Sequence, residues 1–348
     1  MNKKLLSIIF FLSIVASSFS QAGYGVYQFL DLPVSSRMAA LGGSNISLRD
    51  DDLNFAFMNP ALLTGNTSSV IGLNVANYLA DIQFGTAVYG HTFGKKNYVA
   101  VGVQYVDYGH FRGYDELKEP TEDFTAKDFA LNIIYARPLT KNITVGGTFK
   151  PIYSVFERYS SFGLAMDAGI NYNNPEQDFS AGLVFRNIGS QLKGYYSDND
   201  GQHYEPLAFN VMLGLTQKLK HAPLRFSATF HNLQKWDLSY QSTNQPTQTL
   251  ITDTEAKDDE ISFFDMFFRH TIIGVEFVPG KNFYLAAGYH HRRRQEMAMN
   301  GFKSMTGFSF GGGIKLYKFQ VGFGMTQFQV GNYSYQFSIS TSLNEFRL

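Results

Sequence analysis

The last part of the chain alternates almost without exception between apolar and polar side chains. After Gly331, every second position up to residue 343 carries Tyr, Phe, Ile, Thr or Leu, and the positions between them carry Asn, Ser or Gln. Because successive side chains of a β-strand point to opposite faces, this pattern predicts a strand with one apolar and one polar face. The same alternation recurs along the chain between short runs of turn residues.

These recurring patterns predict an all-β fold. The predicted strands cover residues 69–78, 81–93, 97–108, 124–137, 143–156, 161–172, 180–187, 207–218, 225–232, 268–277, 283–291, 307–315, 317–328 and 331–342. An even number of antiparallel strands, polar on one face and apolar on the other, is typical of bacterial transmembrane barrels. The sequence therefore predicts a 14-stranded antiparallel transmembrane β-barrel over residues 69–348.

The lengths of the connections agree with a barrel. The connections after even-numbered predicted strands are short, whereas those after odd-numbered strands include the long segments 109–123, 188–206, 233–267 and 292–306. Outer-membrane barrels have short turns on the periplasmic side and long loops on the outside. The lengths therefore predict that the long loops face the cell exterior.

The start of the chain predicts export to the outer membrane. Lys3 and Lys4 precede an apolar run over residues 5–15, and Ser18-Phe19-Ser20 is a small-x-small cleavage site, so residues 1–20 are predicted to be a secretory signal peptide. The apolar run is too short to span a bilayer. The chain has no cysteine, which excludes a lipidated lipoprotein and a disulfide framework. Its formal net charge of zero argues against nucleic-acid binding through a basic face.

Residues 21–68 do not alternate and predict a compact hatch inside the barrel. Helix-forming residues from Arg37 onward end at Gly42 and Gly43. Asn59 can cap a short helix that has Pro60 at its first position, where the missing amide hydrogen costs nothing. A segment of this length before the first strand can plug the lumen.

Three adjacent acids in this segment, residues 50–52, offer carboxylates for calcium. Their spacing lacks the alternation of a known calcium loop, and pairing with Arg37 or Arg49, or helix capping, is the favoured interpretation. We therefore predict no metal and no cofactor. Nothing in the sequence favours a converging set of catalytic side chains, and we predict no catalytic residue.

A run of basic residues opens one of the long connections. Arg292, Arg293 and Arg294 follow the strand predicted over residues 283–291. Because a guanidinium pairs bidentately with phosphate, the run is a candidate clamp on lipopolysaccharide phosphates or on an acidic partner. The alternative is a solvated rim, or side chains that reach up to any lipid headgroup.

The longest predicted loop, residues 233–267, holds the only tryptophan of the chain. Trp236 stands next to Asp237, and acidic residues and two phenylalanines follow later in the loop. A long outer loop is usually functional or disordered. An exposed aromatic anchor beside acidic groups suits protein docking, and a disordered spacer is the alternative.

Several stretches resemble known families. Residues 37–43 (Arg-Met-Ala-Ala-Leu-Gly-Gly), the acids that follow and Asn59-Pro60-Ala61 resemble the hatch of the FadL-like long-chain fatty-acid transporters, which are fourteen-stranded barrels. Within that superfamily the chain is similar to the PorV/PorQ family of the type IX secretion system, in residues 76–82, 152–154 with Glu157 and Tyr159, 221–227, and 232–233 followed by 236–238.

The second resemblance implies a non-enzymatic barrel in a surface attachment complex. Such a barrel would hold a PorZ-like surface protein, which binds anionic lipopolysaccharide, and through it PorU, a sortase-like peptidase, and PorV. The alternative is a FadL-like transporter of hydrophobic small molecules. A transporter needs an apolar pocket and a lateral opening in the wall, for which Pro151 is a candidate kink because proline cannot donate to a ladder.

Overall fold

A computed structural model describes residues 25–78, 82–115, 117–198, 201–239, 262–280, 282–297, 304–329 and 331–346. The predicted signal peptide and most acids of the 233–267 loop lie outside these residues. Among the residues that are described, no helix is long and apolar enough to cross a membrane.

Antiparallel strands close into a barrel in the order β1-β16-β15-β14-β13-β12-β11-β10-β7-β6-β5-β4-β3-β2, which confirms the predicted 14-stranded fold. The strands are β1 (Val70–Asn77), β2 (Gln83–Phe93), β3 (Asn97–Phe111), β4 (Phe124–Pro138), β5 (Ile143–Phe156), β6 (Tyr159–Asn174), β7 (Phe179–Lys193), β10 (Asn210–Lys218), β11 (Leu224–Phe230), β12 (Thr271–Phe277), β13 (Phe283–His290), β14 (Phe308–Leu316), β15 (Phe319–Gln329) and β16 (Asn332–Ser342). A small hairpin, β8 (Ser197–Asp198) with β9 (Gly201–Gln202), stands outside this ring.

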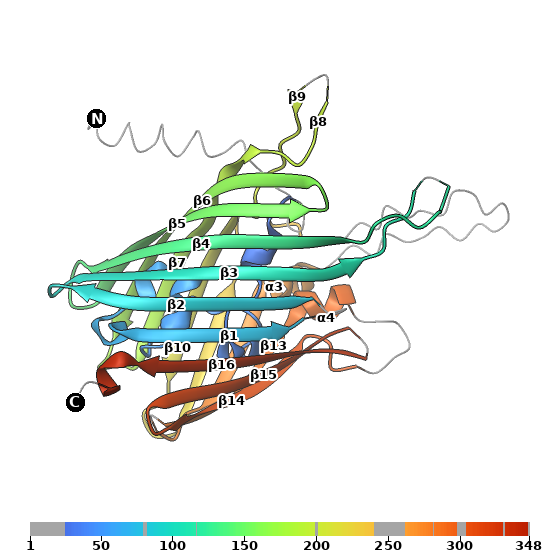
Figure 1. The fold of residues 1–348 in the computed structure, drawn as a ribbon. Coiled ribbons are helices and arrows are strands. Elements are labelled where there is room, and N and C mark those ends of the chain that lie inside the picture. The colour runs from blue at the N-terminus through green and yellow to red at the C-terminus, as the bar shows by residue number, and fades with distance from the viewer. Residues whose placement is uncertain are drawn as a thin grey trace, which may run out of the picture.

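The two ends of the barrel differ as the connection lengths predict (Figure 1). One end, called the turn end below, carries the short connections and the final 3-10 helix η6 (Leu343–Phe346). The other end, called the loop end, carries the long connections with the helices α3 (Phe263–Arg269) and α4 (His291–Met297).

The wall is polar inside and apolar outside, as the alternation predicts. In β1, Asn74 is buried toward the lumen, whereas Leu73 and Val75 on either side are 48% and 59% exposed on the outer surface. The burial pattern of β4 alternates in the same way over most of its length. An outer surface of Leu, Val, Ile, Phe and Tyr side chains suits a lipid environment.

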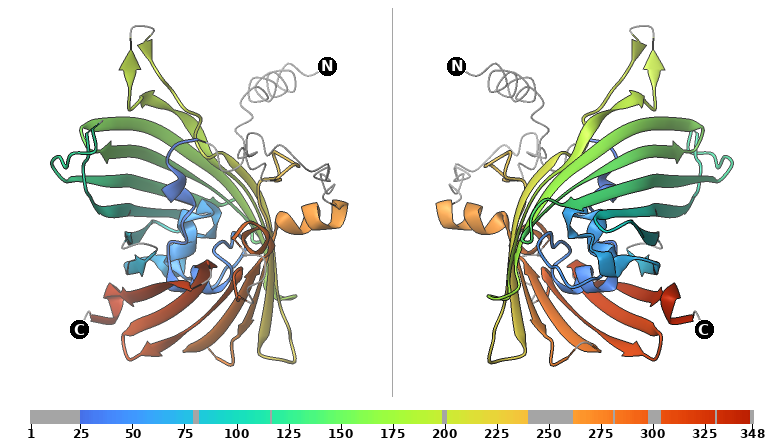
Figure 2. Two further views of the ribbon diagram at one scale, coloured as in Figure 1. Left: turned by 90° about the vertical axis from the view of Figure 1, so that its right-hand side faces the viewer. Right: turned by 90° about the vertical axis from the view of Figure 1, so that its left-hand side faces the viewer.

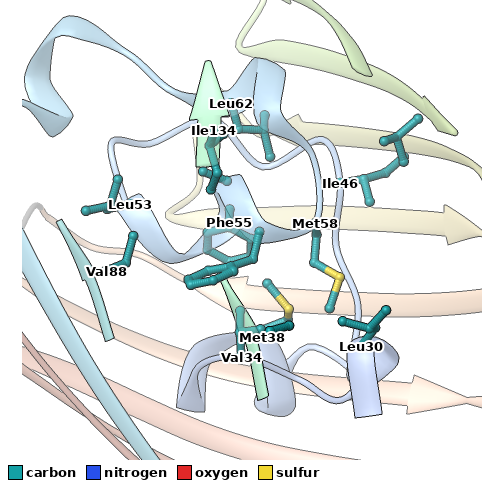
Figure 3. Close-up of a cluster of buried hydrophobic side chains, with 14 of the residues drawn as sticks. Leu30, Val34, Met38, Ile46, Leu53, Phe55, Met58, Leu62, Val88 and Ile134 are labelled. Atoms are coloured by element: carbon teal, nitrogen blue, oxygen red, sulfur yellow. The ribbon is translucent and has the colours of Figure 1, made fainter. Parts of the chain in front are cut away.

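The hatch segment lies within the ring of strands (Figure 2). It consists of the short helices η2 (Gln28–Asp31), α2 (Ser36–Ala40), η3 (Leu53–Phe57), η4 (Pro60–Leu62) and η5 (Gly65–Thr67). Its apolar side chains form a core with the inner wall, which Figure 3 shows for Leu30, Met38, Phe55, Met58 and the wall residue Ile134. These side chains are almost completely buried. The segment therefore fills this part of the lumen as a plug.

Local capping explains where the hatch helices begin and end. The Asn59 side chain accepts a hydrogen bond from the Ala61 amide at 3.0 Å, with Pro60 at the first helical position, as predicted. Helix α2 ends at Ala40, and Gly42 and Gly43 follow with φ angles of 96° and 105°, which are accessible mainly to glycine.

Glycines of the wall allow the hatch backbone to approach closely. A Cβ atom at Gly324 would lie 2.4 Å from the Ser36 carbonyl oxygen, and one at Gly182 would lie 2.3 Å from the Ile46 carbonyl oxygen. Real Cβ atoms do not come so close. Many strand glycines are therefore sites of backbone packing rather than of strand bending.

Four predicted strand limits are wrong by three residues or more, one of them the end of β3, which continues to Phe111 instead of residue 108. Strand β7 continues to Lys193 instead of ending at residue 187, because Asn187 has a positive φ of 55° and the pairing with β6 shifts register nearby, which interrupts the alternation. Residues 207–209 precede β10, and residues 268 and 269 belong to α3. The apolar run in α3 has helical spacing, which competes with the strand interpretation.

The candidate kink at Pro151 does not open the wall. The β4–β5 ladder skips two pairs there, between Ala130↔Ile152 and Ile133↔Phe149, but its register is unchanged on both sides. On the other side Pro151 pairs with Leu164 of β6, and the barrel is closed.

Candidate functional site

A buried ring of charges ties the hatch to the wall. Arg37 of α2 donates from Nε to Glu276 of β12 at 2.8 Å and from Nη2 to Asp50 of the hatch at 2.5 Å. Arg225 of β11 donates to the same two carboxylates, to Glu276 at 2.7 Å and to Asp50 at 3.0 Å. Two guanidiniums and two carboxylates thus alternate around one ring. Arg37 also lies over the Tyr284 ring, 4.6 Å from its centroid.

The ring determines how the hatch groups titrate. Burial alone raises the pKa of Asp50, but Arg37 and Arg225 outweigh it, so the net pKa is lowered. Burial opposes the charge of Arg37, yet Asp50, Glu276 and Asp52 together raise its pKa well above the ordinary value. Both groups therefore stay charged around neutral pH.

Each of the three adjacent acids of the hatch has a partner within the protein. Asp50 and Asp52 pair with Arg37, one of the two arginines named from the sequence, whereas the other, Arg49, donates to Thr144 and Asn171. The Asp51 carboxylate accepts from Thr64 at 2.6 Å and from Asn66 at 2.8 Å. In the described part of the chain, no group of three or more His, Cys, Asp or Glu residues is arranged to hold a metal ion.

A second buried network joins β5, β6 and β7 to the hatch. Lys150 of β5 lies 2.6 Å from the Asp167 carboxylate of β6, and both side chains are fully buried. Next to it, Arg186 of β7 pairs with Asp31 of η2 at 2.9 Å and donates to the Leu30 carbonyl oxygen. This network was not predicted from the sequence. Charged residues at inward positions in the middle of predicted strands are the signal that could have revealed it.

At the loop end, Trp236 stands in an ordered aromatic cluster. Its ring stacks on His270 at 5.3 Å and on Phe263 of α3 at 5.2 Å between centroids. Trp236 is 51% exposed, Phe263 65% and Phe264 72%. Helix α3 projects outward from the barrel wall (Figure 2). We call Trp236, Phe263 and Phe264 the aromatic face.

The start of the 233–267 loop is structured. The Leu233 amide donates to the Val211 carbonyl oxygen, and the Leu238 amide donates to Sδ of Met266. Asp237 accepts from the Ser239 amide and hydroxyl, which lowers the pKa of Asp237. Within the described residues this loop is therefore held in place on both sides of the aromatic face.

The side chains of the three adjacent arginines in helix α4 make different contacts. Arg292 pairs with Glu296 one turn later at 2.6 Å. Arg294 donates to the Ser304 carbonyl oxygen. Arg293 turns toward the hatch, where its Nη2 atom would lie 3.0 Å from a Cβ atom at Gly43, and its guanidinium stacks on Phe328 at 4.3 Å. Contact of these arginines with lipopolysaccharide or an acidic partner stays a prediction.

Arg293 contributes to a cavity of about 270 Å³ between hatch and wall at the loop end. We call it the cationic cavity. Its lining includes both glycines of the hatch motif and two of the three arginines singled out from the sequence; its polar and hatch-turn residues are Gln28, Asp31, Gly42, Gly43, Ser44, Arg186, Asn210, His231, Asn232, His290, Arg292 and Arg293. The fold thus brings together residues that are far apart in sequence.

A second cavity of about 530 Å³, the aromatic cavity, lies between the start of the hatch and the wall near β3–β7. Tyr27, Phe156 and Tyr195 are among its lining residues. Two further lining residues are bonded to each other, since Tyr108 donates to Asp128 at 2.7 Å. Its surface is mainly apolar with a few hydroxyl groups, which suits a hydrophobic ligand or an apolar side chain of a partner.

No family model matches the chain, and no curated protein sequence matches it. Solved structures do. A TodX monoaromatic hydrocarbon channel lacking S2 superposes with a TM-score of 0.52 at 13% identity, over 89% of this chain and 97% of that one. The barrel has the FadL-like fold. A FadL homologue from Pseudomonas aeruginosa gives a TM-score of 0.52 at 11% identity over 89% and 98%. The Pseudomonas putida toluene transporter TodX gives 0.50 at 11% over 89% and 96%.

Proposed function

We propose that this protein is a non-enzymatic outer-membrane barrel of a type IX secretion attachment complex that anchors a PorZ-like surface partner at its loop end. Through that partner it would join PorU and PorV, and cargo would be modified and attached to lipopolysaccharide. In this proposal the long loops face the cell exterior, where a surface protein is met.

The observation that carries the proposal is the exposed aromatic face. Large aromatic side chains that are half or more exposed, stacked on one another and held by an ordered backbone, are the usual anchors of protein interfaces. Because His270 and the α3 backbone fix this face beforehand, docking costs little side-chain entropy. The similarity of residues 232–233 and 236–238 to the PorV/PorQ family supports the same region.

The plug gives a second line of support. A ring of buried charges and a packed apolar core hold the hatch in the lumen. A barrel whose plug is fixed in this way suits an anchoring role better than passage of a solute through the centre.

The experiment is an affinity pulldown of the tagged protein from detergent-solubilised outer membranes, read by mass spectrometry. We expect stoichiometric recovery of a PorZ-like protein with the wild type and its loss with Trp236→Ala combined with Phe263→Ser. Tyr317→Asn is the matched control, because Tyr317 is 84% exposed at the turn end and asparagine tolerates its positive φ. Equal recovery with all three proteins would contradict the proposal.

A second candidate function is transport of hydrophobic small molecules, which the aromatic cavity and the FadL-like fold favour. In that case the pulldown would yield the barrel without a stoichiometric partner but with a co-purified hydrophobic molecule. Tyr195→Ala would then reduce the amount of that molecule, because Tyr195 lines the aromatic cavity, whereas Trp236→Ala would leave it unchanged.

A further inference from the structure

The cationic cavity holds an excess of hydrogen-bond donors. Of the buried side-chain atoms without a hydrogen-bond partner in the described part of the chain, four belong to residues that line this one cavity. They are Nε of Arg186, Nη1 of Arg293, Nε2 of His231 and Oγ of Ser44. Buried polar atoms are nearly always paired, so a concentration of unpaired ones around a single cavity points to a ligand.

Each of these atoms offers a proton. The guanidinium atoms of Arg186 and Arg293 can only donate. His231 accepts at Nδ1 from the Asn232 side-chain amide at 2.9 Å, which places the proton of the neutral imidazole on Nε2. His231 is only 5% exposed. The Ser44 hydroxyl can donate as well. The missing group is therefore an acceptor with several oxygen atoms.

The charges of the lining residues indicate that the ligand is an anion. Arg186 forms an ion pair with Asp31 at 2.9 Å, and Arg292 forms one with Glu296 at 2.6 Å. Arg293 has no carboxylate partner among the described ion pairs and stacks instead on Phe328. A guanidinium that lies between hatch and wall without a counter-ion favours an anion beside it.

The titration of the lining groups is consistent with a positive potential. Burial, with Arg292, His270 and Arg293, lowers the pKa of His231 to about 3, so the ring stays neutral and keeps its single N–H donor. Burial lowers the pKa of Arg293 to about 10, which still leaves this group charged at neutral pH.

We propose that the cationic cavity is a binding site for a phosphate group, either free phosphate or the phosphate monoester of a headgroup or sugar. A tetrahedral oxyanion supplies enough acceptor oxygens for the Arg293 fork, the His231 Nε2–H and the Ser44 hydroxyl at once. An engineered cavity of about 150 Å³ holds a benzene molecule. The volume of about 270 Å³ therefore leaves room for a phosphate with a few attached atoms. This inference does not depend on docking at the aromatic face.

The test is isothermal titration of the purified full-length barrel in detergent with inorganic phosphate, at matched chloride concentration and neutral pH. We expect saturable binding to one site. Arg293→Gln should weaken it about tenfold or more, because a hydrogen bond to a charged group is worth at least that factor. Ser44→Ala should weaken it by a smaller factor.

Arg294→Gln is the matched control, because Arg294 stands next to Arg293 in α4 but donates to a backbone carbonyl and does not line the cavity. It should bind phosphate like the wild type. Absence of saturable binding by the wild type, or equal losses with Arg293→Gln and Arg294→Gln, would overturn the proposal.

Two further arms complete the design. Each variant is first checked for folding by its heat-modifiable migration in SDS gels. If Arg293→Gln does not fold, Arg293→Lys and Ser44→Ala are tested in its place. Unchanged phosphate binding by both of these variants overturns the proposal. Competition by lipopolysaccharide but not by its enzymatically dephosphorylated form assigns the site to a headgroup phosphate. Competition by neither form assigns it to free phosphate or a soluble phosphate ester.

Discussion

Gly288 of β13 lies so close to the hatch that a Cβ atom on it would come within 2.2 Å of the Gly42 backbone nitrogen. The same Cβ atom would meet the Leu41 carbonyl carbon at 2.3 Å, so backbone would have to move on both sides. The end of α2 and the turn that lines the cationic cavity therefore depend on a glycine of the wall.

The first prediction follows from this contact. Gly288→Ala should destabilise the folded barrel by about 1–3 kcal/mol, the usual cost of overpacking, and expose the hatch to protease. Gly85→Ala is the control, since its nearest neighbour is the Asn74 carbonyl oxygen at 3.7 Å. The measurement is the midpoint of heat-modified migration in SDS gels, with limited proteolysis alongside. Identical midpoints for the two variants would show that the hatch does not pack here.

The second prediction concerns Lys150 and Asp167, which pair at 2.6 Å in the interior. Lys150→Ala leaves a buried carboxylate without its partner and should cost about 3–5 kcal/mol of unfolding free energy. Lys127→Ala removes an exposed pair with Asp107 at 3.8 Å and should cost no more than about 1 kcal/mol. Urea unfolding in detergent micelles compares the two. A cost for Lys150→Ala no larger than that for Lys127→Ala would refute the buried pair.

The third prediction concerns pH. His231 has a pKa of about 3 in the folded protein, because of burial and neighbouring cations, against 6.5 for the free side chain. Between pH 3 and pH 6.5 the unfolded chain binds more protons than the folded protein. The contribution of His231 to the stability of the folded protein is therefore complete above pH 6.5 and is lost as the pH falls toward 3, at up to roughly 1.4 kcal/mol per pH unit. Melting temperatures of the wild type should fall over this window. A profile for His231→Gln that falls just as steeply would exclude His231 as the cause.

The fourth prediction concerns the ring of charges. Arg37→Ala removes the guanidinium that joins Asp50 to Glu276 and leaves two carboxylates facing Arg225 alone. We expect the hatch to loosen and the ion conductance of the reconstituted barrel in planar bilayers to rise above that of the wild type. Arg158→Ala, which changes an exposed arginine at the β5–β6 turn, is the control. Conductance that stays at the wild-type level in Arg37→Ala would show that the plug is held by its apolar core alone.

The alternation along the sequence was enough to predict the barrel, because the two faces of each strand meet different solvents. Residues 143–156, for example, form β5 with the limits predicted. Prediction failed where the backbone departs from regular pairing. Asn187 and the nearby register shifts interrupt the alternation, so the last third of β7 was not predicted. The short apolar run of α3 fits a strand and a helix equally well.

The candidate site was predictable in its parts but not in its assembly. The hatch glycines and the arginine run stand out in the sequence, yet only the fold brings Gly43 and Arg293 together across 250 residues of chain. His231 and Ser44 gave no signal, because a single histidine or serine has no recognisable spacing. Helix α4, which separates the three arginines, replaces a predicted loop.

The stacking of Trp236 on His270 and Phe263 has a practical consequence, because no other residue of the chain is a tryptophan. Its indole emission comes from one place, half exposed at the loop end, beside the residues that are proposed to meet a partner. The protein therefore carries its own spectroscopic reporter: a blue shift on adding a partner, or quenching by a brominated lipid, would reveal without any label what the aromatic face touches.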